Sequence, residues 1–335
     1  MKICVVGAGA IGGLVAVKLA RAGEQVSVVA RGAHLAAIRE RGLTLLEGGR
    51  EEVARVAATD RLAELGPQDL VVLAMKAHQL APVAAELPAL CGPETVLLTA
   101  QNGIPWWYFA KYAGPLQGAR LESVDPGGVI AAHLDVERVL GSIIYPAAEI
   151  AAPGVVRHVE GNRITVGELD GRETPRLGRV AEALRAAGFK TRVTGDLRSE
   201  IWVKLWGNCT FNPLSALTHA TLAGIIRFPA TRALATGMMR EAQAVGEKLG
   251  ARFGVSLEKR IAGAEGVGEH KTSMLQDVES GRALEVDALL GAVLELARLT
   301  ETPAPHLAAV HACVSLLSHT LQEQGARLRV EKLGR

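Results

Sequence analysis

The stretch Lys2-Ile-Cys-Val-Val6-Gly7-Ala8-Gly9-Ala10-Ile11-Gly12 sets the architecture, because a short apolar run leads directly into three glycines spaced G-x-G-x-x-G. A helical pattern over 14–21 follows, and 25–30 has the composition of a second strand. The glycine pattern is weak alone, but the order strand, tight turn, helix and strand makes it specific for a dinucleotide-binding unit. We therefore predict an α/β fold that opens with a Rossmann-type, doubly wound parallel sheet.

The three glycines of this motif have different structural roles. Gly7 permits the tight turn, Gly9 lets the backbone approach a pyrophosphate, and Gly12 allows the helix to pack closely on the strand. The N–H groups and the positive dipole end at the start of the helix favour phosphate binding. The alternative is a glycine-rich turn in another α/β fold. We expect the cofactor to contact the backbone of Gly7, Ala8, Gly9, Ala10, Ile11 and Gly12.

The end of the second strand indicates which dinucleotide is bound. NAD-specific sites usually place Asp or Glu there to bond the ribose 2′-hydroxyl, whereas this strand ends Val29-Ala30-Arg31-Gly32. An arginine at this place can bind a 2′-phosphate with bidentate, charge-assisted bonds. His34 and Arg39 could add to the positive field, although an ordinary solvated side chain is the simpler interpretation of each. We expect NADPH as the cofactor.

Composition is typical of a two-domain enzyme. The chain has 335 residues, more than one core usually supports, and 49% of them are hydrophobic. A net charge of +2 gives no reason to expect a nucleic-acid partner. No apolar run is long enough for a membrane span, and a strand that starts at the first residues leaves no room for a signal peptide. Four scattered cysteines show no metal-ligand spacing, so we expect no metal and a cytoplasmic location.

Hydrophobic periodicity changes its character near Thr194-Gly195. Strand and helix patterns alternate before this point, whereas long helical patterns follow it. We predict an NADP-binding domain over 1–194 and an all-α substrate or dimerisation domain over 195–335. The expected strands in the first part include 70–74, 95–100, 139–144 and 163–166, and the expected helices in the second are 197–220, 231–250, 256–261, 270–280, 285–299 and 306–324.

The first of these helices carries an unusual polar stripe. Within Glu200–Pro213, Lys204, Asn208 and Asn212 recur every four residues in an otherwise apolar pattern. Side chains four apart share one helix face, and a solvated face would carry mixed charges rather than one ammonium and two amides. The stripe could hold a small polar ligand, or it could be a set of satisfied polar residues in a core helix.

Further polar residues follow strands and helices elsewhere. Lys76 and Asn102-Gly103 come just after two predicted strands, at the sheet edge where ligands bind in open α/β folds. A surface lysine and an ordinary turn are the alternatives. In the second part, Ser273 is followed by Gly281, a natural helix stop, and by Glu285. An acidic residue in a first helical turn is commonplace, because it complements the helix dipole.

Together these residues resemble the ketopantoate reductases (2-dehydropantoate 2-reductases) over nearly the whole chain. The most specific blocks are Lys204-x-x-x-Asn208-x-x-x-Asn212-Pro213 and Ser273-Met-Leu-Gln-Asp277 with Glu285-x-Asp287. The resemblance implies that NADPH reduces a 2-keto acid, with ketopantoate as the leading substrate. Lys204 and Glu285 are then the catalytic pair; the expected substrate-binding residues are Asn102, Asn208, Asn212 and Ser273, and Arg31, Lys76, Asn102, Ala147 and Glu285 join the glycine turn around the cofactor.

Two features depart from the family pattern. Leu222 is apolar where an asparagine helps to bind substrate, and Trp106-Trp107 adds aromatic bulk after Asn102. A different keto acid, or an imine made from a keto acid and an amine, is therefore an alternative substrate. A non-enzymatic NADPH sensor ranks last, because sensors typically lose the proton donor that Lys204 supplies. The helical part could form a homodimer, and a monomer is equally allowed.

Overall fold

The computed structural model describes residues 1–331 and divides into two compact units. The first unit consists of Met1–Asn102, Trp106–Arg120 and Asp125–Leu197, and the second consists of Gly103–Pro105, Leu121–Val124 and the chain from Arg198 onward. The chain therefore enters the second unit twice, in two short segments, before it enters it for good. Each unit has its own architecture and is built around its own core.

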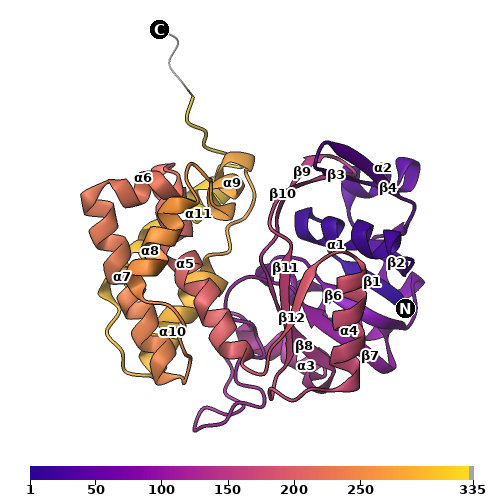
Figure 1. The fold of residues 1–335 in the computed structure, drawn as a ribbon, viewed down its shortest axis with the longest axis horizontal. Helices are drawn as coiled ribbons and strands as arrows, with labels where there is room; N and C mark the ends of the chain where they lie inside the picture. Colours follow the sequence, from indigo (N-terminus) through magenta and orange to yellow (C-terminus); the bar gives the residue numbers. More distant parts are fainter. Residues whose placement is uncertain (332–335) are drawn as a thin grey trace. The chain divides into compact units, whose positions relative to one another are not determined.

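An eight-stranded sheet forms the centre of the first unit (Figure 1). Neighbouring strands are parallel except β8 and β11, which pair antiparallel. Ile3, Cys4 and Val5 are all fully buried, as expected for a central strand covered on both faces. In spatial order the strands are β12 (Lys190–Val193), β11 (Arg163–Glu168), β8 (Val139–Ile144), β7 (Cys91–Thr99), β6 (Gln68–Leu73), β1 (Lys2–Val6), β2 (Gln25–Val29) and β5 (Ala57–Thr59).

Helices connect these strands and cover the sheet. Thr174 caps the start of α4 with its side chain, and Pro175 occupies the first turn, where its missing N–H costs nothing. The helices of this unit are α1 (Ala10–Arg21), α2 (Gly32–Arg41), α3 (Val129–His133) and α4 (Pro175–Ala186), with short 3₁₀ segments η1 (Leu62–Glu64), η2 (Ala77–Gln79), η3 (Ala81–Leu90), η4 (Pro126–Gly128) and η5 (Val136–Arg138).

A second, four-stranded sheet was not among the predicted elements. Its order is β4 (Arg50–Ala54), β3 (Leu43–Glu47), β10 (Val155–Glu160) and β9 (Ala147–Ala152). Strand β10 packs directly on α1, since a Cβ placed on Gly13 would lie 2.6 Å from Val156 Cγ2. This small sheet therefore covers the helix that follows the glycine turn.

The aromatic segment after Asn102 contributes to the core of the first unit. Trp107, Tyr108 and Phe109 are all buried, and the indole N–H of Trp107 donates to Thr99 Oγ1 at 3.1 Å. Tyr108 and Phe109 meet edge to face, with ring centroids 5.0 Å apart. These three side chains therefore pack the interior of the first unit.

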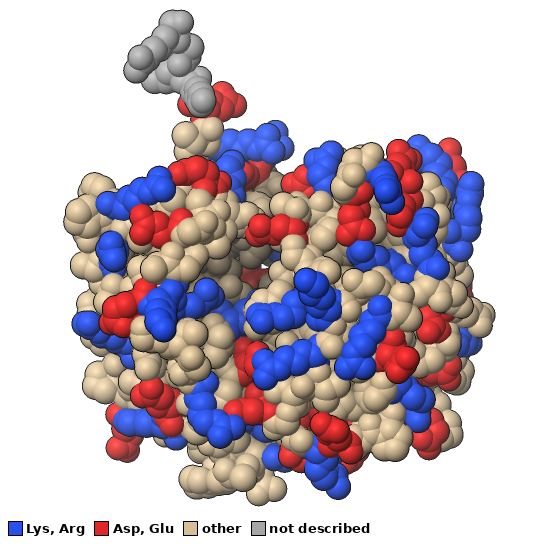
Figure 2. All heavy atoms as spheres, in the orientation of Figure 1, with Lys and Arg blue, Asp and Glu red and all other residues tan. Residues whose placement is uncertain are grey.

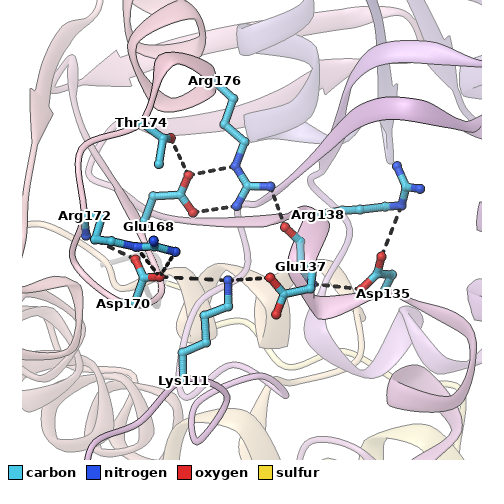
Figure 3. Close-up of polar contacts among 9 residues, drawn as sticks. All are labelled: Lys111, Asp135, Glu137, Arg138, Glu168, Asp170, Arg172, Thr174 and Arg176. Carbon is cyan, nitrogen blue, oxygen red and sulfur yellow. Dashed lines mark hydrogen bonds and ion pairs between the residues drawn. The ribbon is translucent and has the colours of Figure 1, made fainter.

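An ion-pair network holds the same segment at one end of the sheet (Figure 3). Lys111 Nζ lies 2.8 Å from a Glu137 carboxylate oxygen and 4.0 Å from Asp170. Nearby, Arg176 donates from two nitrogens to the buried carboxylate of Glu168. Burial raises the pKa of Glu168, but the bonds from Arg176 and Thr174 outweigh it, so the pKa lies below its usual value. The network ties α4, η5 and the aromatic segment together.

In the described residues of the second unit, all regular secondary structure is helical. Its helices are α5 (Leu197–Thr218), α6 (Leu222–Arg227), α7 (Pro229–Lys248), α8 (Leu257–Gly266), α9 (Ser273–Ser280), the π-helix η6 (Asp287–Gly291), α10 (Ala292–Leu299) and α11 (Pro305–Glu323). Helix α7 packs against α6, α8, α10 and α11. The expected helices are all present, but the one predicted over 285–299 begins as a π-helix, and α6 was not anticipated.

The distribution of charged, apolar and metal-ligating side chains adds three observations. Figure 2 shows Lys and Arg interspersed with Asp and Glu on the face in view, as expected for a chain of net charge +2. Within residues 1–331, no helix combines the length and the apolar character that a membrane crossing requires. The same residues contain no group of three or more His, Cys, Asp or Glu side chains placed to hold a metal ion.

Candidate active site

The glycine turn has almost no free space where its backbone folds back on itself. Gly7 has φ +94°, and a Cβ there would lie 2.8 Å from Met75 N. A Cβ on Gly12 would lie 2.0 Å from the carbonyl oxygen of Gly7. Gly9, which caps α1, has nothing within 4 Å of its Cβ position, so this side of the turn is open. The turn therefore combines tight internal packing with one accessible face, as a bound pyrophosphate requires.

A cavity of about 250 Å³ lies over this face of the turn. Arg31 and His34 contribute its titratable side chains, and Gln79 adds an amide. The cavity is lined by Val6, Gly7, Ala8, Gly9, Val29, Ala30, Arg31, His34, Leu62, Met75, Gln79, Val83 and Ile150. Its position beside the glycine turn and the end of β2 fits a dinucleotide. Leu62, Gln79, Val83 and Ile150 were not predicted, because they come from segments without a recognisable motif.

Other predicted cofactor residues lie at strand ends in the same unit. Lys76 follows β6 and caps η2, and its backbone N–H donates to Gln79 Oε1 at 3.2 Å. Asn102 is half-buried and follows β7 after a short connection. Ala147 is the first residue of β9, and its partner on β10 is Glu160. Lys76 and Asn102 therefore lie at the sheet edge expected from the sequence, whereas Ala147 belongs to the four-stranded sheet. The roles of all three residues toward a cofactor stay predictions.

His34 does not supply positive charge in this structure. Its Nε2 lies 2.8 Å from the carbonyl oxygen of Ala8, and its Nδ1 accepts a hydrogen bond from Gly154 N–H at 3.0 Å. Burial lowers the pKa of His34, although the bond to Ala8 opposes the shift. The suggested addition to the positive field and the solvated-side-chain interpretation are therefore both wrong, since the ring is half-buried and held at both nitrogens.

In the second unit, α5 runs without interruption from Leu197 to Thr218, so the polar stripe lies on one helix. Lys204 and Asn208 are half-buried and Asn212 is buried. Asn212 Nδ2 donates to the hydroxyl of Ser273 at 3.4 Å. Ser273 is the first residue of α9, whose N-cap is Thr272. The structure thus brings two of the four expected substrate residues together, although they are 61 positions apart in the chain.

Lys204 has an unusual protonation equilibrium. Burial lowers its pKa from 10.5 to about 8, and the charge of Glu285 acts in the opposite direction. A lysine with a pKa near the working pH can give up its proton and regain it, as a general acid must. Lys204 and Glu285, which the family resemblance names as a pair, therefore also interact electrostatically.

Glu285 precedes the π-helix η6, which is a rare form of helix that often occurs near functional sites. The carbonyl oxygen of Ala288 in this helix accepts a hydrogen bond from Ile104 N–H at 2.9 Å. Gly103 has φ +88°, and a Cβ there would lie 2.2 Å from the same oxygen. Glycine is therefore required after Asn102, and the sequence indicated only a turn at this place.

Two further residues of the expected motifs have structural partners. Asp277 is buried on α9 and accepts a hydrogen bond from Arg282 Nε at 2.8 Å, which fits a supporting role. Leu222 is the first residue of α6, and its N–H donates to the carbonyl of His270 at 3.2 Å. Leu222, the apolar residue that departs from the family pattern, therefore lies at the start of a helix.

Comparison with known proteins agrees with this geometry. The family model "Ketopantoate reductase PanE/ApbA" matches residues 3–171, and the model of its C-terminal part matches residues 196–318. A 2-dehydropantoate 2-reductase of Mesorhizobium japonicum is 54% identical over 319 residues, which cover 95% of this chain and 98% of that protein. 

Solved structures give the same result. A candidate ketopantoate reductase from Ralstonia solanacearum has a TM-score of 0.92 at 41% identity and covers 96% of this chain and 98% of that one. A PanE/ApbA family ketopantoate reductase from Ralstonia eutropha has a TM-score of 0.82 at 27% identity and covers 96% and 100%. The chain belongs to the ketopantoate reductase family, and with it to the NADPH-dependent oxidoreductases that act on a CH–OH group.

Proposed function

We propose that this protein reduces a 2-keto acid to a 2-hydroxy acid with NADPH, and that the keto acid is 2-dehydropantoate (ketopantoate). The product would be pantoate, an intermediate of pantothenate and coenzyme A biosynthesis. The observation that carries the proposal is Lys204, whose pKa is lowered to about 8 by burial and which has Glu285 as its counter-charge and two amides on its helix face. The name of the 54% identical relative supports the choice of substrate.

In the proposed reaction, Lys204 and Glu285 have different roles. Bound NADPH supplies the hydride. Lys204, when protonated, polarises the ketone oxygen and donates a proton as that oxygen becomes an alkoxide, a contribution of typically about 10²–10⁴ in rate. Its charge also stabilises the developing negative oxygen in surroundings that are less polar than water. Glu285 orients Lys204 and keeps it protonated.

The amides and the hydroxyl are proposed to fix the substrate. Asn208, Asn212 and Ser273 can donate hydrogen bonds to a carboxylate and accept from a hydroxyl group. Asn102 would serve both substrate and cofactor, while Lys76, Arg31, Ala147 and the glycine turn would hold NADPH. The open face of Gly9 and the adjoining cavity of about 250 Å³ support this assignment.

A different keto acid, or an imine, is the second candidate. The apolar side chain of Leu222 favours it, because it removes a polar contact that the family pattern would place there. Trp107 gives it less support, since this side chain packs in the core of the first unit. A non-enzymatic sensor is the third candidate, and the retained Lys204 argues against it.

The remaining assignments belong to the same proposal. We propose that residues 1–194 bind NADPH and that residues 195–335 bind substrate, with 332–335 outside the described residues. We also propose that the protein forms a homodimer through its helical domain, because this domain exposes apolar side chains such as Leu316. We propose a cytoplasmic location because the proposed reaction belongs to biosynthesis.

The role of Lys204 can be tested by Lys204→Ala. We expect turnover with ketopantoate to fall by about 10²–10⁴, while NADPH binding measured by fluorescence titration stays unchanged. Lys259→Ala is the matched control, because Lys259 is an exposed lysine of α8 in the same unit. Unchanged turnover in Lys204→Ala would sink the assignment of Lys204 as the proton donor.

A further inference from the structure

His34 links two backbone segments that are far apart in the sequence. Its Nε2 is 2.8 Å from Ala8 O in the glycine turn, and its Nδ1 is 3.0 Å from Gly154 N in the turn between β9 and β10. A backbone N–H can only donate, so Nδ1 must be the unprotonated acceptor. The proton of the neutral ring is therefore on Nε2, from which it is donated to Ala8 O. The two contacts together select one tautomer.

The bond to Ala8 fixes a peptide plane in the lining of the cavity beside the glycine turn. The carbonyl of Ala8 and the N–H of Gly9 belong to the same trans peptide and point in opposite directions. Holding the carbonyl therefore also holds the N–H of Gly9, the residue whose Cβ side is open. On the other side, the N–H groups of Gly7 and Ala8 both donate to Val29 O, at 3.1 Å and 3.0 Å. The turn is held between β2 and His34.

The bond from Gly154 fixes the β9–β10 hairpin. Gly154 has φ +78°, and a Cβ there would lie 3.0 Å from Ala37 Cβ on α2. Its carbonyl accepts a hydrogen bond from Thr44 N–H at 2.9 Å. This hairpin carries Ile150, which lines the cavity beside the glycine turn. His34 thus connects the two walls of the same cavity.

We propose that His34 is a positioning residue of the cofactor site, which clamps the glycine turn to the β9–β10 hairpin while its imidazole is neutral. The proposal rests on NADPH being the cofactor of the proposed function. It extends that function, because it assigns a task to a residue outside the glycine motif and the strand ends.

Protonation would open the clamp. It adds a second N–H at Nδ1, which then faces the N–H of Gly154 and cannot accept from it. Arg31, the N-cap residue of α2, is the charged group that shares the cavity lining with His34, and Arg39 of α2 donates to the carbonyl of Ala58. The glycine turn and the Pro153-Gly154 turn carry no titratable side chain. Burial already lowers the pKa of His34, so NADPH affinity should fall as the pH drops through that lowered value.

Two variants separate the two contacts. His34→Gln places an amide nitrogen near the Nε2 position, so it can still donate to Ala8 O. His34→Asn places an amide oxygen near the Nδ1 position, so it can still accept from Gly154 N–H. Neither side chain titrates between about pH 5 and about pH 8. We expect His34→Asn to weaken NADPH binding by about fivefold at neutral pH, the loss of one net hydrogen bond, and His34→Gln to weaken it less.

The measurement is the NADPH dissociation constant from about pH 5 to about pH 8.5, a range that extends below ordinary histidine titration because the pKa of His34 is lowered. The 2′-phosphate titrates in the same range, so the ratio of wild type to His34→Gln is taken at each pH and the phosphate contribution cancels. We expect wild type to lose affinity relative to His34→Gln as the pH falls. A ratio independent of pH would overturn the proposal, and so would a relative gain at acid pH, which would mean that charged His34 attracts phosphate.

An independent readout uses the chain without any ligand. In protein labelled with ¹⁵N-histidine, the signal that disappears in His34→Gln belongs to His34. We expect chemical shifts of a neutral ring protonated at Nε2 and an unprotonated Nδ1. The opposite tautomer would overturn the clamp even if a variant were poorly folded. Neither measurement uses substrate turnover, so failure of the clamp and failure of the proposed reaction are distinguishable.

Discussion

Glu285 raises the pKa of Lys204 against the burial that lowers it, and the balance leaves the lysine with a pKa of about 8. Lys204 lies on α5 and Glu285 just before the π-helix η6, so the pair joins two helices of the second unit. An ordinary lysine would keep its proton throughout the physiological range. The pKa of Lys204 lies close enough to neutral pH for the side chain to lose and regain its proton.

The first prediction concerns the pH profile. Lys204 must be protonated to act as the acid, so turnover should decline as the pH rises through about 8. Glu285→Gln removes the charge that raises this pKa, and the alkaline limb should therefore move to lower pH. Steady-state turnover at saturating substrate over a pH series measures the shift. Asp287→Asn is the matched control, because this exposed carboxylate lies two residues away. A limb that stays in place in Glu285→Gln would contradict the pairing.

The second prediction concerns stability. The folded state lowers the pKa of Lys204 from 10.5 to about 8, so between these values the unfolded chain binds more protons and stability rises with pH. Below about pH 8 the cost of burying the charge is fully present. Lys204→Met should therefore raise the melting temperature at pH 7, by roughly 2–4 °C for each kcal/mol gained, while turnover is lost. Scanning calorimetry should show that the difference in melting temperature between Lys204→Met and the wild type becomes smaller toward pH 10. A lower melting temperature at pH 7 would argue against a costly buried charge.

The third prediction concerns cofactor choice. Arg31 lines the cavity beside the glycine turn, at the end of β2, where a ribose would lie. Arg31→Ala should weaken NADPH binding by about tenfold or more, the loss of a charge-assisted hydrogen bond. NADH binding should barely change, because NADH has no 2′-phosphate. Titration of the same preparation with both nucleotides gives the preference directly. Equal losses for the two nucleotides would show that Arg31 does not read the phosphate.

The fourth prediction concerns the glycine turn. Gly12→Ala places a Cβ 2.0 Å from Gly7 O, which must force the helix away from the turn. Such overpacking typically costs about 1–3 kcal/mol, and we expect NADPH binding to be lost as well. Gly178→Ala is the control, since nothing lies within 4 Å of its Cβ position in α4. That change should stabilise the protein by up to about 1 kcal/mol through helix propensity. Urea denaturation of both variants compares them, and a neutral Gly12→Ala would count against the packing described.

The sequence was most informative where one local rule governs a segment. The Rossmann-type opening, the strand Val139–Ile144 and the helix Leu197–Thr218 followed from hydrophobic periodicity and from the glycine spacing. The four-stranded sheet did not. Its strands β3 and β10 pair across more than a hundred residues, and in β9 and β10 only Val156 is buried, so neither strand has a strong apolar pattern. Non-local pairing of this kind leaves no periodic signal.

The site residues, like the elements of the fold, could be predicted where the signal is local in the sequence and not where it depends on distant contacts. Lys204, Asn208 and Asn212 were found because a four-residue period in a helix is visible in the sequence. The role of His34 was missed, because its partners are two backbone groups 26 and 120 positions away. The necessity of Gly103 was missed for a related reason, since only the position of Ala288 O excludes a side chain there. Contacts to backbone atoms depend on the fold and not on residue type.

The central claim is tested most directly by the oxidation of NADPH with ketopantoate, measured beside a panel of other 2-keto acids and with NADH in parallel. We expect the highest kcat/KM for ketopantoate with NADPH, and a much lower value with NADH. A higher kcat/KM for another keto acid would keep the roles of Lys204 and Glu285 but contradict the proposed substrate. Tight NADPH binding without turnover of any substrate would contradict the proposed reaction itself.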